Sequence, residues 1–289
     1  MTAQATPGLR GWMMRHRIAS FVILTYAIMN IAWWPVLWLF PGMSMEQHFT
    51  TPSHLPLIYL AGASPTWAAL IITYTLDGKE GLAALVRKFK GRAPGWTWIA
   101  AFTLPMLTAI AGVILYSAVY GSLGAIAWPA WYLIIPPFAL ILFIAGPLCE
   151  ETGWRGYLQP LVMERCGLIV SSLIIGTIWT FWHIPFMQTI GGTSPINAPI
   201  DLLLYWLGVV AHSAMLVVLI SRANWSIPVA MAFHWSINAS MSAIVQPLFP
   251  NATNAQFDVA YNLDTVVSVI VAVVMLLWAA SKNRESNRA

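Results

Sequence analysis

The feature that most constrains this chain is a succession of eight apolar stretches, each long enough to cross a lipid bilayer. A membrane-spanning helix needs about 20 mostly apolar residues, because the hydrocarbon core is about 30 Å thick. Of the 289 residues, 59% are hydrophobic and only 8% are charged, whereas soluble proteins average about 25% charged residues. We therefore predict an all-α polytopic membrane protein that forms a single membrane domain over residues 1–289. Its eight transmembrane helices are expected at residues 18–40, 57–75, 96–119, 131–157, 168–187, 200–221, 226–246 and 263–280.

The basic residues support this number of spans and orient the chain. All 14 Lys and Arg residues fall on one side of an eight-span arrangement: before the first span, between the second and third, at the junction of the fourth and fifth, after the sixth and after the eighth. Because loops rich in Lys and Arg stay in the cytoplasm, both termini are predicted to be cytoplasmic, in a plasma membrane that we expect to be bacterial. Residues 76–95 alternate apolar and basic side chains, which indicates either a short helix on the membrane surface or a solvated basic loop.

One cluster of ionisable residues stands inside this apolar sequence. Glu150, Glu151 and Arg155 follow a run, residues 131–148, that holds no charged residue. Each such group costs about 2.5–3.5 kcal/mol at membrane depth, so the three are expected to be paired or functional. Glu151 and Arg155 have the i, i+4 spacing of a helical ion pair, with the acid first. Glu150 points about 100° away; we predict that it pairs with Trp154 and faces a cavity.

Two later spans carry further polar residues. His183 lies among aromatic residues in the fifth span, and His234 and Asn238 stand at i and i+4 in the seventh. Counting 1.5 Å per residue places Glu150 and His234 at about the same depth, on the order of 10–12 Å from the cytoplasmic side, but His183 at about 22 Å. We still predict that the three spans bring these four side chains to one pocket that opens inward.

A carboxylate and two imidazoles support two mechanisms of peptide-bond hydrolysis. In the first, Glu150 and His183 activate a water as general base, and His234 with Asn238 donates hydrogen bonds to the oxyanion. In the second, Glu150, His183 and His234 hold a Zn²⁺ ion whose bound water is the nucleophile. The residues leave a glutamate-type protease and a metalloprotease open, although the chain has no His-Glu-x-x-His sequence.

These three polar elements resemble the motifs of the CPBP family, the CAAX proteases and bacteriocin-processing enzymes that are also called Abi. The family's motifs are Glu-Glu-x-x-x-Arg, Phe-x-x-x-His and His-x-x-x-Asn, in this order. The matching residues are Glu150, Glu151 and Arg155 for the first motif, Trp179 (in place of Phe) and His183 for the second, and His234 and Asn238 for the third. The resemblance covers mainly residues 131–245, the expected catalytic core.

The resemblance implies an eight-helix intramembrane endopeptidase similar to the CAAX prenyl proteases. Glu150 and His183 would activate the water or bind the metal, and His234 and Asn238 would form the oxyanion site. The expected partners are the lipid bilayer and a peptide or protein substrate, prenylated in some members, but no nucleic acid. An alternative function is a non-catalytic immunity or scaffold protein that binds a peptide in the same cavity. A proton-coupled transporter fits less well, because the outer halves of the spans lack ionisable residues.

Overall fold

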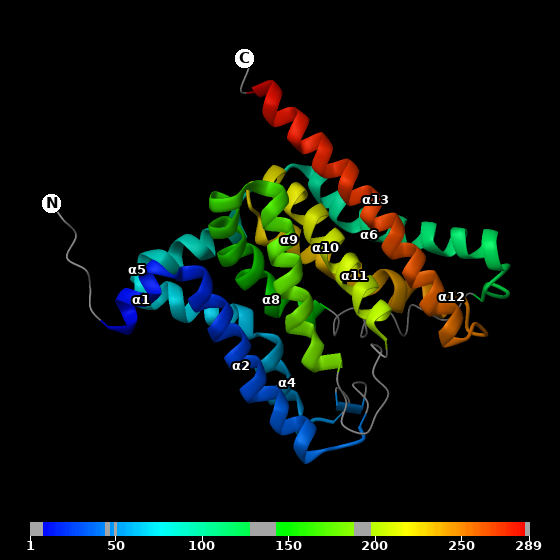
Figure 1. Ribbon diagram of the computed structural model, residues 1–289, viewed down its shortest axis with the longest axis horizontal. Coiled ribbons are helices and arrows are strands. Elements are labelled where there is room, and N and C mark those ends of the chain that lie inside the picture. The colour runs from blue at the N-terminus through cyan, green and yellow to red at the C-terminus, as the bar shows by residue number, and fades with distance from the viewer. Residues whose placement is uncertain (1–7, 44–46, 49–50, 128–142, 188–197, 287–289) are drawn as a thin grey trace.

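The computed structural model describes residues 8–43, 47–48, 51–127, 143–187 and 198–286, and all regular elements in these ranges are helices. Helices α2, α4 and α5 lie on one side of the bundle, α6 and α13 lie on the other, and α8 to α11 lie between them (Figure 1). Chain order and bounds are α1 (Leu9–Arg15), α2 (Arg17–Leu39), α4 (Leu55–Gly62), α5 (Ser64–Lys90), α6 (Gly95–Tyr120), η1 (Ile144–Leu148), α8 (Cys149–Glu151), η2 (Thr152–Leu158), α9 (Gln159–Met187), α10 (Pro199–Arg222), α11 (Ile227–Ala239), η3 (Ser240–Val245), α12 (Gln246–Leu248) and α13 (Asn254–Ser286), where η marks a π-helix.

The described helices confirm the predicted all-α polytopic membrane protein. Five stretches are long and apolar enough to cross a membrane, and α4 with α5, bent by 59° at their junction, makes a sixth if the two helices cross as one span. One of the five, Gly146–Met187, contains both the end of the predicted fourth span and the whole fifth span. The predicted seventh span corresponds to consecutive α11, η3 and α12. The first part of the predicted fourth span, residues 131–142, lies outside the described residues.

Helix α9 reverses direction at Gly167. This residue has a φ of 72° and a ψ of −179°, a backbone conformation that glycine adopts without the steric cost of a Cβ atom. The Gln159 side-chain amide donates a hydrogen bond to Ser171 Oγ over 3.1 Å, although 12 residues of straight helix would separate them by about 18 Å. The reversal therefore brings the second half of α9 back alongside the segment that carries Glu150.

Helix α5 also bends, at Gly78, where φ is 64°. Beyond it, residues 79–90 continue as a helix, so the basic segment is helical rather than an irregular loop. Leu85 is buried against Ile227 and Met231, whereas Val86 and Phe89 are exposed. This pattern agrees with the predicted helix at the membrane surface, where exposed apolar side chains contact lipid.

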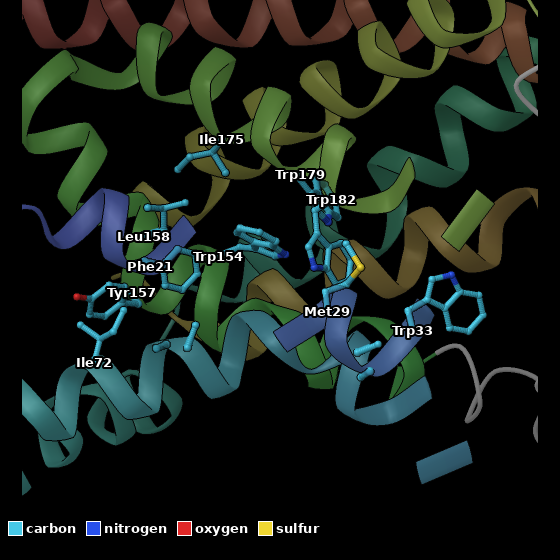
Figure 2. Packing of buried hydrophobic residues seen from close by; sticks show 14 of the residues in the cluster. Phe21, Met29, Trp33, Ile72, Trp154, Tyr157, Leu158, Ile175, Trp179 and Trp182 are labelled. Atoms are coloured by element: carbon cyan, nitrogen blue, oxygen red, sulfur yellow. The ribbon is translucent and has the colours of Figure 1, made fainter. Parts of the chain in front are cut away.

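A group of buried aromatic residues packs α2, η2 and α9 against one another. Figure 2 shows Trp154 from η2 and Trp182 from α9 beside Phe21 and Met29 from α2. The rings of Trp154 and Trp182 meet edge to face with centroids 5.8 Å apart. The Trp182 indole N–H donates to Ser64 Oγ over 3.0 Å, so this buried ring also has a polar partner. This core fixes the position of η2 and α9 relative to each other.

Candidate active site

The first polar motif lies on a helix with two π-helical interruptions. Glu150 and Glu151 belong to the single turn α8, which η1 precedes and η2 follows. Pro147 in η1 has no backbone N–H, so the α-helical hydrogen-bond pattern cannot continue through it. π-Helical turns change the direction of the side chains that follow and are frequent at functional sites. All seven residues of η2 are buried.

Glu151 connects a guanidinium group and an imidazole ring in the centre of the bundle. Its Oε1 atom lies 3.1 Å from Arg155 Nη1 and 2.7 Å from His234 Nδ1, and all three side chains are buried. The ion pair with Arg155 was predicted from the i, i+4 spacing. The contact with His234 was not, because 83 residues separate it from Glu151. Since a carboxylate oxygen accepts hydrogen bonds, the Nδ1 atom of His234 carries a proton.

Glu150 is held by two tryptophans through the same oxygen. Its Oε2 atom accepts hydrogen bonds from Trp179 Nε1 at 2.8 Å and from Trp154 Nε1 at 3.2 Å. The predicted pairing with Trp154 is confirmed. The contact with Trp179 was missed, although the sequence contains a signal for it: the family motif has Phe at this position, and Phe cannot donate a hydrogen bond.

His183 lies one helical turn beyond Trp179 and is half-buried. Its Nδ1 atom is 2.8 Å from the Trp179 carbonyl oxygen. Because a carbonyl only accepts, Nδ1 carries the proton, which leaves Nε2 as the acceptor in the neutral ring. The ring centroid of Trp179 lies 5.6 Å from that of His183 and 5.0 Å from that of His234. The indole thus contacts both imidazoles.

Three polar atoms converge next to Gly146 in η1. A methyl group on Gly146 would lie 2.8 Å from Asn238 Nδ2, 3.4 Å from His234 Nε2 and 3.7 Å from Glu150 Oε1. The second and third motifs contribute differently. Asn238 and His234 reach this point directly, whereas His183 contacts the Trp179 indole, which donates to Glu150. The structure therefore groups Glu150, His234 and Asn238, supports them with Glu151 and Arg155, and places His183 beside the Trp179 indole.

The three predicted zinc ligands, Glu150, His183 and His234, lie in or beside this cluster. Within the described parts of the chain, no three His, Cys, Asp or Glu side chains lie close enough together to hold one metal ion. The set Glu150, His183 and His234 thus does not form a metal site in this arrangement. Zinc stays a prediction, which metal analysis of the purified protein with chelator inactivation and zinc restoration tests.

Fold and polar cluster together define a class of protein: a polytopic membrane protein with carboxylate, imidazole and amide groups buried among its helices. Residues 129–240, which include every predicted site residue, match the family model for type II CAAX prenyl endopeptidase Rce1-like. The chain is also 24% identical over 235 residues to CAAX prenyl protease 2 of Methanococcus maripaludis, over 78% of this chain and 83% of the relative. Both comparisons confirm the predicted relationship to the CPBP family and support a CAAX protease-like function.

Proposed function

We propose that this protein is an intramembrane endopeptidase of the CAAX type, which hydrolyses a peptide bond near the carboxyl end of a prenylated protein. One observation carries the proposal: Glu150 Oε1, His234 Nε2 and Asn238 Nδ2, from two separate helical segments, surround one point beside Gly146. A general base and two hydrogen-bond donors around a single point are what the attack of water on a carbonyl requires. The one-sided distribution of Lys and Arg supports a site that opens to the cytoplasm.

In the proposed reaction, Glu150 accepts a proton from the attacking water. The two indole N–H groups hold Oε2, so Oε1 is the oxygen that takes the proton. The water oxygen then bonds to the scissile carbonyl carbon. When the carbon–nitrogen bond breaks, the proton passes from Glu150 to the departing amine. His183 Nε2, an acceptor in the tautomer fixed by the Trp179 carbonyl, assists as a second base.

Asn238 and His234 stabilise the negative oxygen of the tetrahedral intermediate. His234 acts with protons on both ring nitrogens: Nδ1–H donates to Glu151, and Nε2–H donates to the substrate oxyanion. The carboxylate of Glu151 balances the charge of His234, and Arg155 holds that carboxylate in place. In a buried site such preorganised donors are worth more than in water, because no solvent must reorganise during the reaction.

The substrate is tested with two peptides that differ only in a farnesyl group on the cysteine of a C-terminal Cys-a-a-X sequence. Protein in liposomes is incubated with each peptide in ¹⁸O-labelled water, and the products are analysed by mass spectrometry. We expect release of the last three residues from the farnesylated peptide and one ¹⁸O atom in the new carboxyl group. An intact peptide, together with identical membrane proteomes from wild-type and Glu150→Gln cells, would contradict the proposed activity.

The Trp179→Phe variant should lower kcat by about ten- to hundredfold and change KM little. It removes one hydrogen bond to an ionised group, which contributes about 1.5–3 kcal/mol, and each 1.36 kcal/mol corresponds to about tenfold in rate. Steady-state cleavage kinetics measure both constants. Trp182→Phe is the matched control, since this indole donates to Ser64 and not to Glu150. Equal effects on kcat from the two variants would show that the Trp179 indole does not position Glu150.

The Gly146→Ala variant should lower kcat by about 10²- to 10³-fold, the usual effect of losing one oxyanion donor. The added methyl group would lie 2.8 Å from Asn238 Nδ2, so the amide must move away from the point at which the polar groups converge. Cleavage kinetics test this. Gly95→Ala, at the start of α6 with no atom within 4 Å of the new methyl group, is the control. Full activity of Gly146→Ala would place the oxyanion elsewhere.

A further inference from the structure

A second cavity lies at the junction of α2, α5, η2 and the start of α9, outside the candidate active site. Its volume is about 590 Å³, within the range of about 300–1,000 Å³ that small-molecule sites occupy. None of the predicted catalytic residues lines it. Its charged residues are Arg17 from α2 and Asp77, Glu80 and Lys88 from the two sides of the Gly78 bend. We call it the α2–α5 cavity.

Two hydroxyl groups in its wall have no hydrogen-bond partner among the described residues: Thr73 Oγ1 and Tyr157 Oη. Both residues are more than nine-tenths buried, with 5% and 8% of their surface exposed. The Tyr157 ring stacks on Phe21, and its hydroxyl points away from Trp154 in Figure 2. An unpaired buried hydroxyl costs about 1–3 kcal/mol. A ligand with acceptor oxygens would remove this cost at two points of the same wall.

The charges around the cavity are of both signs. Arg17 binds Asp77 through two hydrogen bonds of 2.6 and 2.8 Å. Lys88 Nζ donates to the Gly156 carbonyl at 2.6 Å, and an ammonium group has three N–H donors, so two more are available. A purely anionic ligand would face Asp77 and Glu80, and a purely cationic ligand would face Arg17 and Lys88. A zwitterion satisfies both pairs.

The cavity lies beside the surface helix 79–90. That helix exposes Val86 by 51% and Phe89 by 37% and carries Arg87, Lys88 and Lys90, a composition typical of the boundary between phospholipid headgroups and acyl chains. The most abundant molecules at that depth are the headgroups themselves. Apolar side chains of Leu85 and Leu161 also line the cavity, as contact with the apolar part of a lipid requires.

We propose that the α2–α5 cavity binds the headgroup of a phospholipid that carries a phosphate and a primary ammonium group, as phosphatidylethanolamine does. The phosphate oxygens accept hydrogen bonds from Thr73, Tyr157 and Lys88, and the ammonium group donates to the carboxylates of Asp77 and Glu80. Gly156 and Tyr157 directly follow Arg155 in η2, so the bound lipid also holds the segment that positions Glu151. This binding is independent of the proposed peptidase activity.

The test is lipid retention by the purified full-length protein. Protein in detergent is incubated with phosphatidylethanolamine, phosphatidylcholine and phosphatidylglycerol of identical acyl chains, and native mass spectrometry counts the bound lipids. We expect one phosphatidylethanolamine per chain, preferred about tenfold or more over the others. Phosphatidylcholine has no N–H on its quaternary nitrogen, and phosphatidylglycerol has no cation. The Thr73→Val/Tyr157→Phe variant should retain about tenfold less of all three lipids, and Asp77→Asn/Glu80→Gln should lose the preference for phosphatidylethanolamine. Thr25→Val, which alters a buried unpaired hydroxyl outside the cavity, should keep both the retention and the preference.

Thermal unfolding gives a second measurement that does not depend on retention in the mass spectrometer. A ligand that binds only the folded state raises the unfolding temperature, so phosphatidylethanolamine should stabilise wild type and Thr25→Val but not the Thr73→Val/Tyr157→Phe variant. Equal retention of the three lipids by wild type, or undiminished retention by the Thr73→Val/Tyr157→Phe variant, would overturn the proposal. Displacement of the lipid by an equal concentration of soluble phosphoethanolamine would also overturn it, because the ligand would then be a free solute.

Discussion

Replacing Glu150 by Gln should lower kcat by about 10²- to 10⁴-fold while the protein stays folded. Removing a general base costs about this much, and an amide cannot take the proton from the attacking water. The Gln side chain keeps the size of Glu, and its oxygen can still accept from Trp154 and Trp179. A neutral amide is also less costly to bury than a carboxylate, so stability should not fall. Cleavage kinetics and thermal unfolding of the same preparation measure both quantities.

Glu164→Gln is the control for this variant, because Glu164 is an exposed acid on α9. It should leave both the rate and the unfolding temperature at the wild-type values. If Glu150→Gln cleaved the substrate as fast as wild type, Glu150 would not be the base and the proposed mechanism would be wrong. A peptide-binding immunity or scaffold protein, in contrast, would tolerate the substitution and still protect its cell.

The straight spans could be predicted from the sequence to within one residue at each end. The stretches 18–40, 96–119 and 200–221 correspond to α2, α6 and α10, because apolar composition over a fixed length decides where a helix crosses lipid. The interrupted segments could not. The bend at Gly78, the reversal at Gly167 and the π-helical segment that contains Pro147 depend on backbone geometry, which hydropathy does not report. Each of them nevertheless contributes to the position of a polar cluster.

Within the site, contacts between neighbours on one helix were predicted, whereas contacts between distant segments were not. The pairs Glu151–Arg155 and Glu150–Trp154 follow from i, i+4 spacing on one helix, and both were predicted. The Trp179–Glu150 hydrogen bond joins residues 29 positions apart and required the hairpin at Gly167. It also bears on the position of His183: Trp179 is level with Glu150, so His183 lies one turn, about 6 Å, farther along α9. This offset is smaller than the difference of about 10–12 Å that counting residues indicates.

Replacing Glu151 by Gln should affect stability, which Glu150→Gln leaves unchanged. We expect it to lower the free energy of unfolding by about 3–5 kcal/mol. Removing one partner of a buried ion pair leaves the other charge without compensation. Here two partners are affected, because Arg155 and His234 both bind Glu151 Oε1. Arg155 is fully enclosed and cannot reach water by a change of rotamer. Denaturant titration or thermal unfolding in detergent measures the loss.

The double variant Glu151→Gln/Arg155→Met identifies the cause of this instability. It removes the unbalanced cation and fills its place with an apolar chain, so it should regain much of the stability that Glu151→Gln loses, since well-packed apolar replacements of buried ion pairs are often neutral. With the single variant Arg155→Met as the fourth member of a double-mutant cycle, the loss in the double variant minus the sum of the two single losses gives the coupling free energy of the pair. If Glu151→Gln unfolded at the wild-type temperature and lost only activity, Glu151 would belong to the chemistry, and the division of roles between the two adjacent carboxylates would be wrong.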